Sequence, residues 1–300
     1  MATAWTLLHK PLLADRTTLG LGGHALAEIR VFAEQGLPEL PGLLASLGGK
    51  PVAFGAGSNI VAADGELPLV LLSAAWSEGP EVAREEEGEV FVRVSGGQRL
   101  CVLLGKLAAA GFSGLEGLAG IPGSVGGAIA MNAGSFGHAM GDALESVTVY
   151  APDGGRQTAG REELELGYRH MAFRGKGQND SWFMITSAVA RLKKSSPGSV
   201  RAAMREHMAR KKNTQPVGEK SAGCVFKNPS PDMPAGKLLD EAGFRGKRLG
   251  GMMFSHLHAN FLVNEGKGTA EAAFDLIDMA REAVRLRCGV VLEPEVKIWR

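Results

Sequence analysis

The sequence predicts a mixed chain of the α/β or α+β class. Short runs rich in β-branched residues recur between helical patterns of leucine and alanine, as in folds that combine sheets with helices. The 42 glycines among 300 residues cluster at 20–23, 55–57, 96–97, 111–127 and 134–141, between the strand-like runs. Such clusters indicate backbone in unusual conformations, or backbone that a ligand approaches closely.

Hydrophobic periodicity places the individual elements. Strands are expected at Ile29–Phe32, Pro51–Phe54, Leu69–Leu72, Val90–Val94, Val147–Tyr150 and Phe183–Leu192. Helices are expected over Leu37–Leu47, Leu100–Ala110, Val200–Lys212 with Ser199 as N-cap, and from the N-cap Thr269 to Arg287. The polar stretch 193–199 marks a boundary, and the closing VVLEPEVKIW has strand character.

The overall composition narrows the class of protein. With 45% hydrophobic residues, a chain of this length can bury a sizeable core, and two domains are favoured over one. The 33 basic and 32 acidic residues give a formal net charge of +1, which leaves no electrostatic footprint for nucleic acid. No signal peptide or membrane-spanning run is evident, so we expect a cytoplasmic protein without membrane insertion. We also expect a monomer.

Cysteine usage argues against a metal site. Cys101, Cys224 and Cys288 are odd in number and widely spread, without the spacing of a zinc site or a disulfide framework. Cys224 could instead be the nucleophile of a hydrolase or transferase, with His256 or His258 as its base. That alternative leaves the glycine clusters unexplained.

Two glycine-rich segments are candidates for a ligand cradle. In PVAFGAGSNIV (51–61), an apolar strand runs into backbone that could form an anion nest, with side-chain donors from Ser58 and Asn59. Segment 113–137 is rich in glycine and almost free of charge, which favours a large ligand. The alternatives are a plain tight turn and a glycine-rich packing element. The Rossmann and Walker A patterns both fail on spacing and context.

Eight segments, in order along nearly the whole chain, resemble the UDP-N-acetylenolpyruvoylglucosamine reductase family, flavoenzymes of peptidoglycan precursor synthesis. They are RTTLGLGG (16–23), FGAGSN (54–59), GLEGLAGIPGSVGGAIAMNAGSFG (114–137), GYRHMAF (167–173), QPVGEKSAGCVFKNP (215–229), AGKLLDEAGFRG (235–246), HANFLVN (258–264) and LEPEV (292–296). Each motif is weak alone, but eight in register are specific.

The resemblance implies an α+β fold with a two-lobed FAD-binding portion of the vanillyl-alcohol-oxidase (PCMH) type. This portion would span 1–195, with lobes of roughly 1–74 and 75–195. A C-terminal α/β substrate-binding domain would span 196–288, and 289–300 would be a strand that returns Glu295 toward the active site. The resemblance also implies the shorter subtype, which lacks an extra tyrosine-bearing loop.

The reaction implied by the resemblance is reduction of the enolpyruvyl ether of UDP-N-acetylglucosamine enolpyruvate to UDP-N-acetylmuramate. FAD would take hydride from NADPH and deliver it to C3 of the substrate. The residues that resemble the family's FAD cradle are Gly55, Ala56, Gly57, Ser58, Asn59, Gly120, Ile121, Pro122, Gly123, Ser124, Gly126, Gly127, Ala128, Asn132, Ala133 and Gly134.

The resemblance assigns three residues to the chemistry. Arg169 would contact the substrate carboxylate as negative charge develops. Glu295 would stabilise the enol, and the resemblance alone selects it over Glu293. Cys224 stands where most members carry a serine that donates a proton to C2; a thiol, with a pKa near ~8.5, can donate without activation. Met171 replaces a usual serine and puts a polar contact near Arg169 in doubt.

Tyr168, Lys227 and Asn228 would line the substrate site by the same resemblance. The competing interpretations are packing for Tyr168 and a turn ending at Pro229 for the other two. Another FAD-linked oxidoreductase of the same fold is a further alternative, in which His138 could attach the flavin covalently. A flavoprotein sensor would need neither Cys224 nor Glu295.

Overall fold

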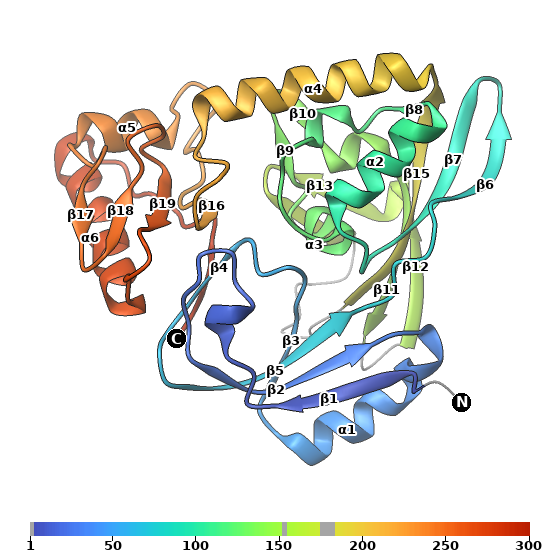
Figure 1. Ribbon diagram of the computed structural model, residues 1–300, viewed down its shortest axis with the longest axis horizontal. Coiled ribbons are helices and arrows are strands. Elements are labelled where there is room, and N and C mark those ends of the chain that lie inside the picture. The colour runs from blue at the N-terminus through green and yellow to red at the C-terminus, as the bar shows by residue number, and fades with distance from the viewer. Residues whose placement is uncertain (1–2, 152–154, 175–183) are drawn as a thin grey trace. The chain divides into compact units, whose positions relative to one another are not determined.

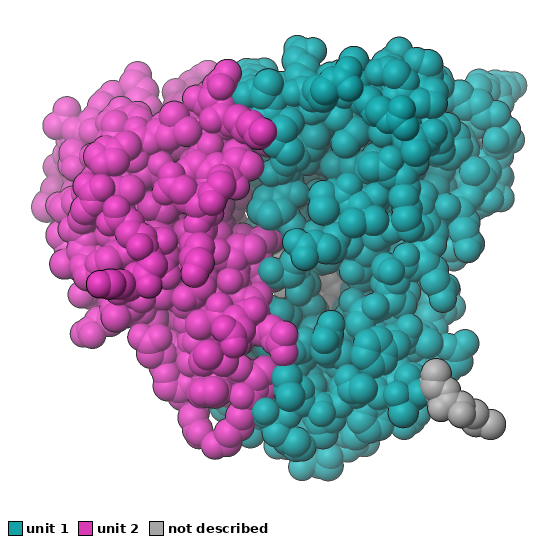
Figure 2. All heavy atoms as spheres, in the orientation of Figure 1, with its two compact units in different colours: residues 1–9, 26–56, 68–210 teal, residues 10–25, 57–67, 211–300 magenta. Residues whose placement is uncertain are grey.

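The computed structural model describes residues 3–151, 155–174 and 184–300. Its secondary structure is shown in Figure 1, and Figure 2 colours its two compact units. Unit 1 comprises residues 1–9, 26–56 and 68–210, and unit 2 comprises residues 10–25, 57–67 and 211–300. The chain therefore enters unit 2 twice before its C-terminal third. The functional domains expected at 1–195, 196–288 and 289–300 stay a prediction.

The first sheet has four strands in the order β1-β2-β5-β3. They are β1 (Trp5–His9), β2 (His24–Val31), β5 (Glu66–Ala74) and β3 (Lys50–Ala53). Helix α1 (Leu40–Leu47) contributes Leu40 to the core formed with Ile29, Val70 and Tyr150. The strand predictions here are confirmed. The helix begins three residues later than predicted, after the 3-10 turn Glu34–Glu39, since two prolines interrupt regular amide bonding.

The larger sheet of unit 1 is antiparallel, in the order β12-β11-β15-β7-β6, and β8 also pairs with β15. Its strands are β6 (Glu81–Glu86), β7 (Glu89–Ser95), β8 (Phe112–Ser113), β11 (Leu144–Ala151), β12 (Gly155–Gly160) and β15 (Met184–Lys194). Helices α2 (Leu100–Ala110) and α3 (Val125–Ala130) pack their apolar faces into the same core. The prediction for α2 is confirmed; Phe183 lies outside the described residues.

Two small hairpins and one long helix complete unit 1 (Figure 1). The hairpins are β9–β10 (Gly134–Ser135 and His138–Ala139) and β13–β14 (Leu164–Gly167 and His170–Phe173). Helix α4 (Pro197–Thr214) begins in unit 1 and ends in unit 2. The prediction that Ser199 caps it is wrong: the helix begins at Pro197, and the Ser196 hydroxyl accepts the Ser199 amide at 3.1 Å. Proline suits a first helical turn because its missing N–H has no partner there.

Unit 2 contains a four-stranded antiparallel sheet in the order β16-β19-β18-β17. The strands are β16 (Ser221–Cys224), β17 (Arg248–Leu249), β18 (Met252–Phe254) and β19 (Phe261–Asn264), and the helices are α5 (Ala235–Glu241) and α6 (Ala270–Cys288). As predicted, Thr269 caps α6, and its hydroxyl accepts the Ala272 amide at 3.2 Å.

A parallel strand pair joins an N-terminal segment of the chain to the C-terminus within unit 2. β4 (Ile60–Ala62) pairs with β20 (Lys297–Trp299) at the C-terminus. Val61 and Leu19 are buried in the same core as Phe226 and Leu276. The closing strand is thus shorter than the sequence suggested. The segment before it pairs only through an isolated bridge, Phe226 with Pro294.

Candidate active site

The two predicted glycine-rich segments meet inside unit 1. Gly55 lies against Ser124, so close that a Cβ at position 55 would overlap the serine hydroxyl. A side chain at position 55 would displace the Ser124 hydroxyl, which is the N-cap of α3 and accepts the Gly127 amide at 3.2 Å. The close approach explains why the motif after β3 requires glycine.

The meeting point offers backbone donors to a ligand. In the part of the chain that the structure describes, the amides of Gly55, Ala56, Gly123 and Ser124 donate to no protein acceptor. Other groups of the same loop are anchored: Val125 N–H donates to the Gln98 carbonyl at 2.8 Å. Two pairs of unused donors from neighbouring segments suit a ligand rich in acceptors, such as a diphosphate. The residues present therefore fit the expected FAD.

Several other predicted cradle residues have packing roles. Gly126 donates to the Gly96 carbonyl at 2.8 Å, Ala128 is buried, and Ile121 and Ala133 pack on the core of unit 1. For these positions the packing interpretation accounts for the residue type. Pro122 is exposed. Contact with the cofactor at Gly120, Gly127 and Gly134 stays a prediction.

Asn132 joins the glycine-rich segment to the hairpin that carries Arg169. Its Nδ2 donates to the Gly167 carbonyl and its Oδ1 accepts the Gly141 amide, both at 2.8 Å. Gly167 is the last residue of β13, directly before Tyr168 and Arg169 at the hairpin tip. Asn132 was predicted to contact the cofactor, and the structure gives it a second role in placing this tip.

Arg169 occupies an unusual backbone conformation. Its φ of 55° lies in the left-handed region, which strains any residue with a Cβ. Its guanidinium carbon lies 5.2 Å from the Tyr168 ring centroid, and Tyr168 is 54% exposed. Met171, two residues further, is buried in the core, so no polar contact to Arg169 is expected from that position. The positive φ falls in the two-residue turn between β13 and β14, and the catalytic role of Arg169 stays a prediction.

Cys224 and Glu295 lie on neighbouring segments of unit 2. Strand β16 ends at Cys224, and its register with β19 shifts between Ser221 and Cys224, where Gly223 adopts a φ of 81°. Beyond Cys224, the Val225 carbonyl accepts the Glu295 amide at 2.7 Å, and the Lys227 amide donates to the Glu293 carbonyl at 2.9 Å. The pairing places the main chains of Cys224 and Glu295, 71 positions apart in the sequence, on neighbouring segments. Arg169 belongs to the other unit.

The second half of the FGAGSN motif, Gly57 to Asn59, belongs to unit 2. There the Asn59 side-chain amide donates to the Glu295 carbonyl at 3.1 Å, and the Asn59 carbonyl accepts the Lys297 amide at 2.9 Å. The Gly57 carbonyl accepts the Thr18 amide at 3.1 Å. Asn59 is therefore hydrogen-bonded to the main chain at Glu295 and at Lys297. Its predicted contact with the cofactor, like that of Ser58, stays a prediction.

The predicted substrate residues Lys227 and Asn228 both have protein partners. Lys227 Nζ lies 2.5 Å from Glu293, whose side chain is 70% exposed. Asn228 Oδ1 accepts the Ala235 amide at 3.0 Å, at the start of α5. The two glutamates of LEPEV thus differ: Glu293 is exposed and paired with Lys227, whereas Glu295 is half-buried. The choice of Glu295 over Glu293 as the catalytic carboxylate stays a prediction.

One contact was missed by the sequence analysis. The Thr18 hydroxyl donates to the Ser221 carbonyl at 2.6 Å, at the first residue of β16. Thr18 lies in RTTLGLGG, a segment noted only for its resemblance. The only sequence signal for this contact was that Thr18 lies next to the glycine cluster 20–23. The sequence does not show which distant carbonyl group its hydroxyl contacts.

The histidines of the rival interpretations have other contacts. His138 packs edge-on against His207, with ring centroids 5.0 Å apart. His258 Nδ1 accepts the Asn260 amide at 3.2 Å. Burial, and secondarily the charge of Arg245, lowers the pKa of His258 from its ordinary value. The Nδ1 of His258 is thus used as an acceptor within its own segment.

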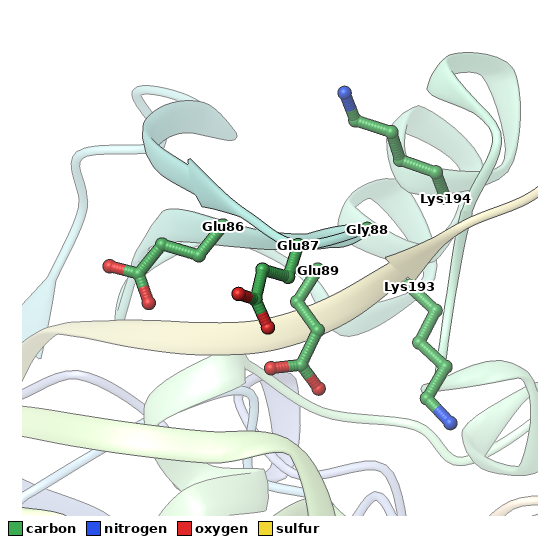
Figure 3. Close-up of a pocket in the computed structure, with 6 residues that line it drawn as sticks. All are labelled: Glu86, Glu87, Gly88, Glu89, Lys193 and Lys194. Carbon is green, nitrogen blue, oxygen red and sulfur yellow. The ribbon is translucent and has the colours of Figure 1, made fainter.

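A surface hollow lies at the β6–β7 turn and is lined by none of the predicted site residues (Figure 3). It is lined by Glu86, Glu87, Gly88, Glu89, Lys193 and Lys194. Among the described residues, no group of three or more histidine, cysteine or acidic side chains could hold a metal ion. The helices of this same part of the chain include none long and apolar enough to cross a membrane.

Two family models match the chain. The model described as an FAD binding domain covers residues 43–160, and the C-terminal domain of UDP-N-acetylenolpyruvoylglucosamine reductase covers residues 215–299. The predicted fold class, a PCMH-type FAD-binding portion with the family's C-terminal domain, is thereby confirmed. FAD is the cofactor.

Whole-length relatives carry the same name. The reductase of Nitratidesulfovibrio vulgaris is 52% identical over 97% of this chain and 98% of its own length. That of Oleidesulfovibrio alaskensis is 51% identical over 98% of each. The crystal structure of the Thermus caldophilus reductase matches with a TM-score of 0.79 and 34% identity, covering 99% of this chain and 100% of that one. This chain therefore belongs to the UDP-N-acetylenolpyruvoylglucosamine reductase family of FAD-dependent oxidoreductases.

Proposed function

We propose that this protein reduces UDP-N-acetylglucosamine enolpyruvate to UDP-N-acetylmuramate with NADPH, in the cytoplasm, during peptidoglycan precursor synthesis. The observation that carries the proposal is the hydrogen bond from the Glu295 amide to the Val225 carbonyl, next to Cys224. It pairs the segment that follows Cys224 with the segment that carries the half-buried Glu295, within one unit. Reduction of an enol ether requires a proton donor and a group that stabilises the enol.

The cofactor has a suitable binding surface in the unused amides of Gly55, Ala56, Gly123 and Ser124. FAD held there would supply the hydride for reduction of the substrate's terminal CH2 to a methyl group. The remaining steps fall to side chains of this chain. They must hold the substrate carboxylate, stabilise the charge that develops on it, and deliver one proton to C2.

Cys224 is the proposed proton donor. After hydride addition at C3, C2 is the carbon of an enolate and needs one proton to give the lactyl ether. A thiol is mostly protonated at neutral pH and is a stronger acid than the hydroxyl that most relatives use. The proton leaves sulfur as the C2–H bond forms, and the thiolate is then reprotonated from solvent. Positioned acids typically contribute ~10²–10⁴-fold.

Arg169 and Glu295 are the proposed stabilisers of the enolate. A guanidinium presents parallel donors that match a carboxylate, and this interaction strengthens as charge accumulates. Glu295, in its protonated form, would donate a hydrogen bond to the enolate oxygen. Its main chain is fixed by Val225 and by Asn59, which limits the positions that its carboxyl group can reach. Tyr168, Lys227 and Asn228 would bind the rest of the substrate.

Product analysis tests this function. Purified holoenzyme, NADPH and UDP-N-acetylglucosamine enolpyruvate are expected to yield UDP-N-acetylmuramate, heavier than the substrate by two hydrogens in mass spectrometry. Glu295→Gln should retain FAD but lose about 10²-fold or more in rate. Glu293→Gln is the matched control, because it changes the neighbouring carboxylate and should preserve turnover. A wild-type enzyme that consumes NADPH without forming this product would exclude the proposed substrate.

A further inference from the structure

Asn260 is hydrogen-bonded to the segment that follows Cys224. Its side chain makes two hydrogen bonds to one residue: Oδ1 accepts the Phe226 amide at 3.0 Å, and Nδ2 donates to the Phe226 carbonyl at 2.8 Å. Its main-chain carbonyl accepts the Val225 amide at 2.8 Å. Asn260 is only 2% exposed, and Phe226 is fully buried. Hydrogen bonds in such a dry environment are electrostatically stronger than at the surface.

We call the two hydrogen bonds between the Asn260 side chain and Phe226 the Asn260 clamp. The clamp lies where the ladder between β16 and β19 ends. The ladder between β16 and β19 ends with Cys224 opposite Phe261, so the chain after Cys224 has no further ladder partner from β19. A side-chain amide carries the same donor and acceptor as a peptide group. Asn260 therefore pairs with Phe226 as a strand residue would, at the point where the regular ladder stops.

The other edge of the same segment carries Glu295. Val225 accepts the Glu295 amide, and Lys227 donates to the Glu293 carbonyl. The segment 225–227 thus lies between Asn260 on one edge and 293–295 on the other. Moving Phe226 would shift Cys224 through the covalent chain and Glu295 through the Val225 carbonyl. Both candidate groups therefore depend on one buried side chain.

We propose that Asn260 is a positioning residue that fixes Cys224 and Glu295 relative to each other. The inference rests on the proposed roles of those two residues. Asn260 is not assigned any contact with substrate or cofactor. Displacements of about 1 Å among reacting groups can cost about 10²-fold in rate, so a loosened clamp should slow proton delivery and enol stabilisation.

The chain supplies a matched control in Asn264, at the other end of β19. Its Nδ2 donates to the Leu19 carbonyl at 3.0 Å, and its Oδ1 accepts the Gly266 and Gly268 amides at 2.9 and 3.0 Å. Asn264 is thus a side-chain clamp of the same chemistry that holds other segments. If Asn260 acts only through general stability, both variants should behave alike.

The experiment compares Asn260→Asp with Asn264→Asp in the holoenzyme. Each change keeps an acceptor oxygen and replaces the NH2 donor by an oxygen that faces a carbonyl. We expect kcat to fall about 10- to 100-fold in Asn260→Asp, with KM changed less than about threefold. Hydrogen exchange of peptide 221–229 should accelerate in this variant only. Asn264→Asp should keep kcat within about threefold of wild type. Asn260→Ala removes both side-chain bonds without adding charge and serves if the aspartate variant does not fold.

The outcomes separate this inference from the proposed function. Wild-type kcat in a folded Asn260 variant, unchanged exchange of peptide 221–229, or equal kcat losses in the Asn260 and Asn264 variants would each overturn the positioning role. If wild-type enzyme itself fails to convert UDP-N-acetylglucosamine enolpyruvate, the function fails. The clamp is then judged by hydrogen exchange and by the alkylation rate of Cys224, with the exposed Cys101 and Cys288 as internal references.

Discussion

The main-chain amide of Glu295 donates a 2.7 Å hydrogen bond to the carbonyl of Val225, the residue after Cys224. This bond pairs the LEPEV segment with the residues that follow β16. Asn59 adds a second hold on the Glu295 carbonyl. Cys224 and Glu295 are therefore coupled through the backbone, so a substitution that moves one main chain should also move the other.

Replacing Cys224 tests proton donation. Cys224→Ser keeps an X–H donor and should retain kcat within about tenfold of wild type. Cys224→Ala removes the donor and should lower kcat by ~10²–10⁴-fold, while NADPH still reduces the flavin at the wild-type rate. Stopped-flow absorbance measures the two half-reactions separately. Equal losses in the two variants would contradict the assignment, because a role limited to packing does not distinguish a hydroxyl from a methyl group.

The ion pair between Lys227 and Glu293 should compete with substrate. Exposed pairs of this kind contribute about 0.2–1 kcal/mol, and Glu293 is 70% exposed. If Lys227 binds substrate, Glu293→Gln should lower KM about two- to fivefold by releasing the ammonium group. Lys227→Met should raise KM. Steady-state kinetics at low ionic strength measure both effects, and a higher KM in Glu293→Gln would show that the pair supports the site instead.

Arg169 should lower the stability of the fold through its backbone strain and should be required for turnover. Glycine adopts a φ of 55° without the strain that a side chain adds, which is about 1–2 kcal/mol. Arg169→Gly should therefore be no less stable than wild type in thermal unfolding, yet about 10²-fold or more slower in turnover. Glu87, with a φ of 41° at the β6–β7 turn, is the matched control. Glu87→Gly should relieve similar strain and leave turnover unchanged. Full activity in Arg169→Gly would remove the arginine from the mechanism.

The buried Lys211 should make stability depend on pH. It is 1% exposed, and burial lowers its pKa from 10.5 to about 8. Below pH 8 the folded protein must bury a charge, at a cost of about 3 kcal/mol. As pH rises from 8 to 10.5, the folded state loses its proton before the unfolded state, so this cost is relieved. Lys211→Met should be more stable than wild type at pH 7, and its stability should not increase between pH 8 and 10.5.

The exposed neighbour Lys212 provides the control for that measurement. Lys212→Met should leave the pH dependence of unfolding at its wild-type shape. Denaturant unfolding at pH 7, 8.5 and 10 distinguishes the two variants. An alkaline rise that persists in Lys211→Met would assign the effect to another group.

Local pattern predicted the elements better than their exact ends. The spacing of leucine and alanine and the following glycine were enough for α2, which spans the predicted residues. The starts of α1 and α4 were misplaced, because they depend on prolines and on which serine accepts an amide. Such choices are made by a few hydrogen bonds that periodicity does not register.

The site was predictable as a set of motifs but not as a set of contacts. Motifs selected Cys224, Glu295 and the glycine-rich segments as candidates. They could not show that Asn59 holds Glu295 across 236 positions, or that Asn132 holds the Arg169 hairpin. Nor could they distinguish Asn260, a clamp, from an ordinary polar residue in a buried strand. Long-range bonds between side chain and backbone leave no local signature in the sequence.

The most direct test of the central claim is the visible spectrum of the purified holoenzyme during two successive anaerobic additions. NADPH is added first and UDP-N-acetylglucosamine enolpyruvate second. The account predicts that NADPH bleaches the oxidised-flavin absorbance and that the enolpyruvyl substrate restores it, with one UDP-N-acetylmuramate formed per flavin. A flavin that stays bleached after the substrate is added would contradict the account.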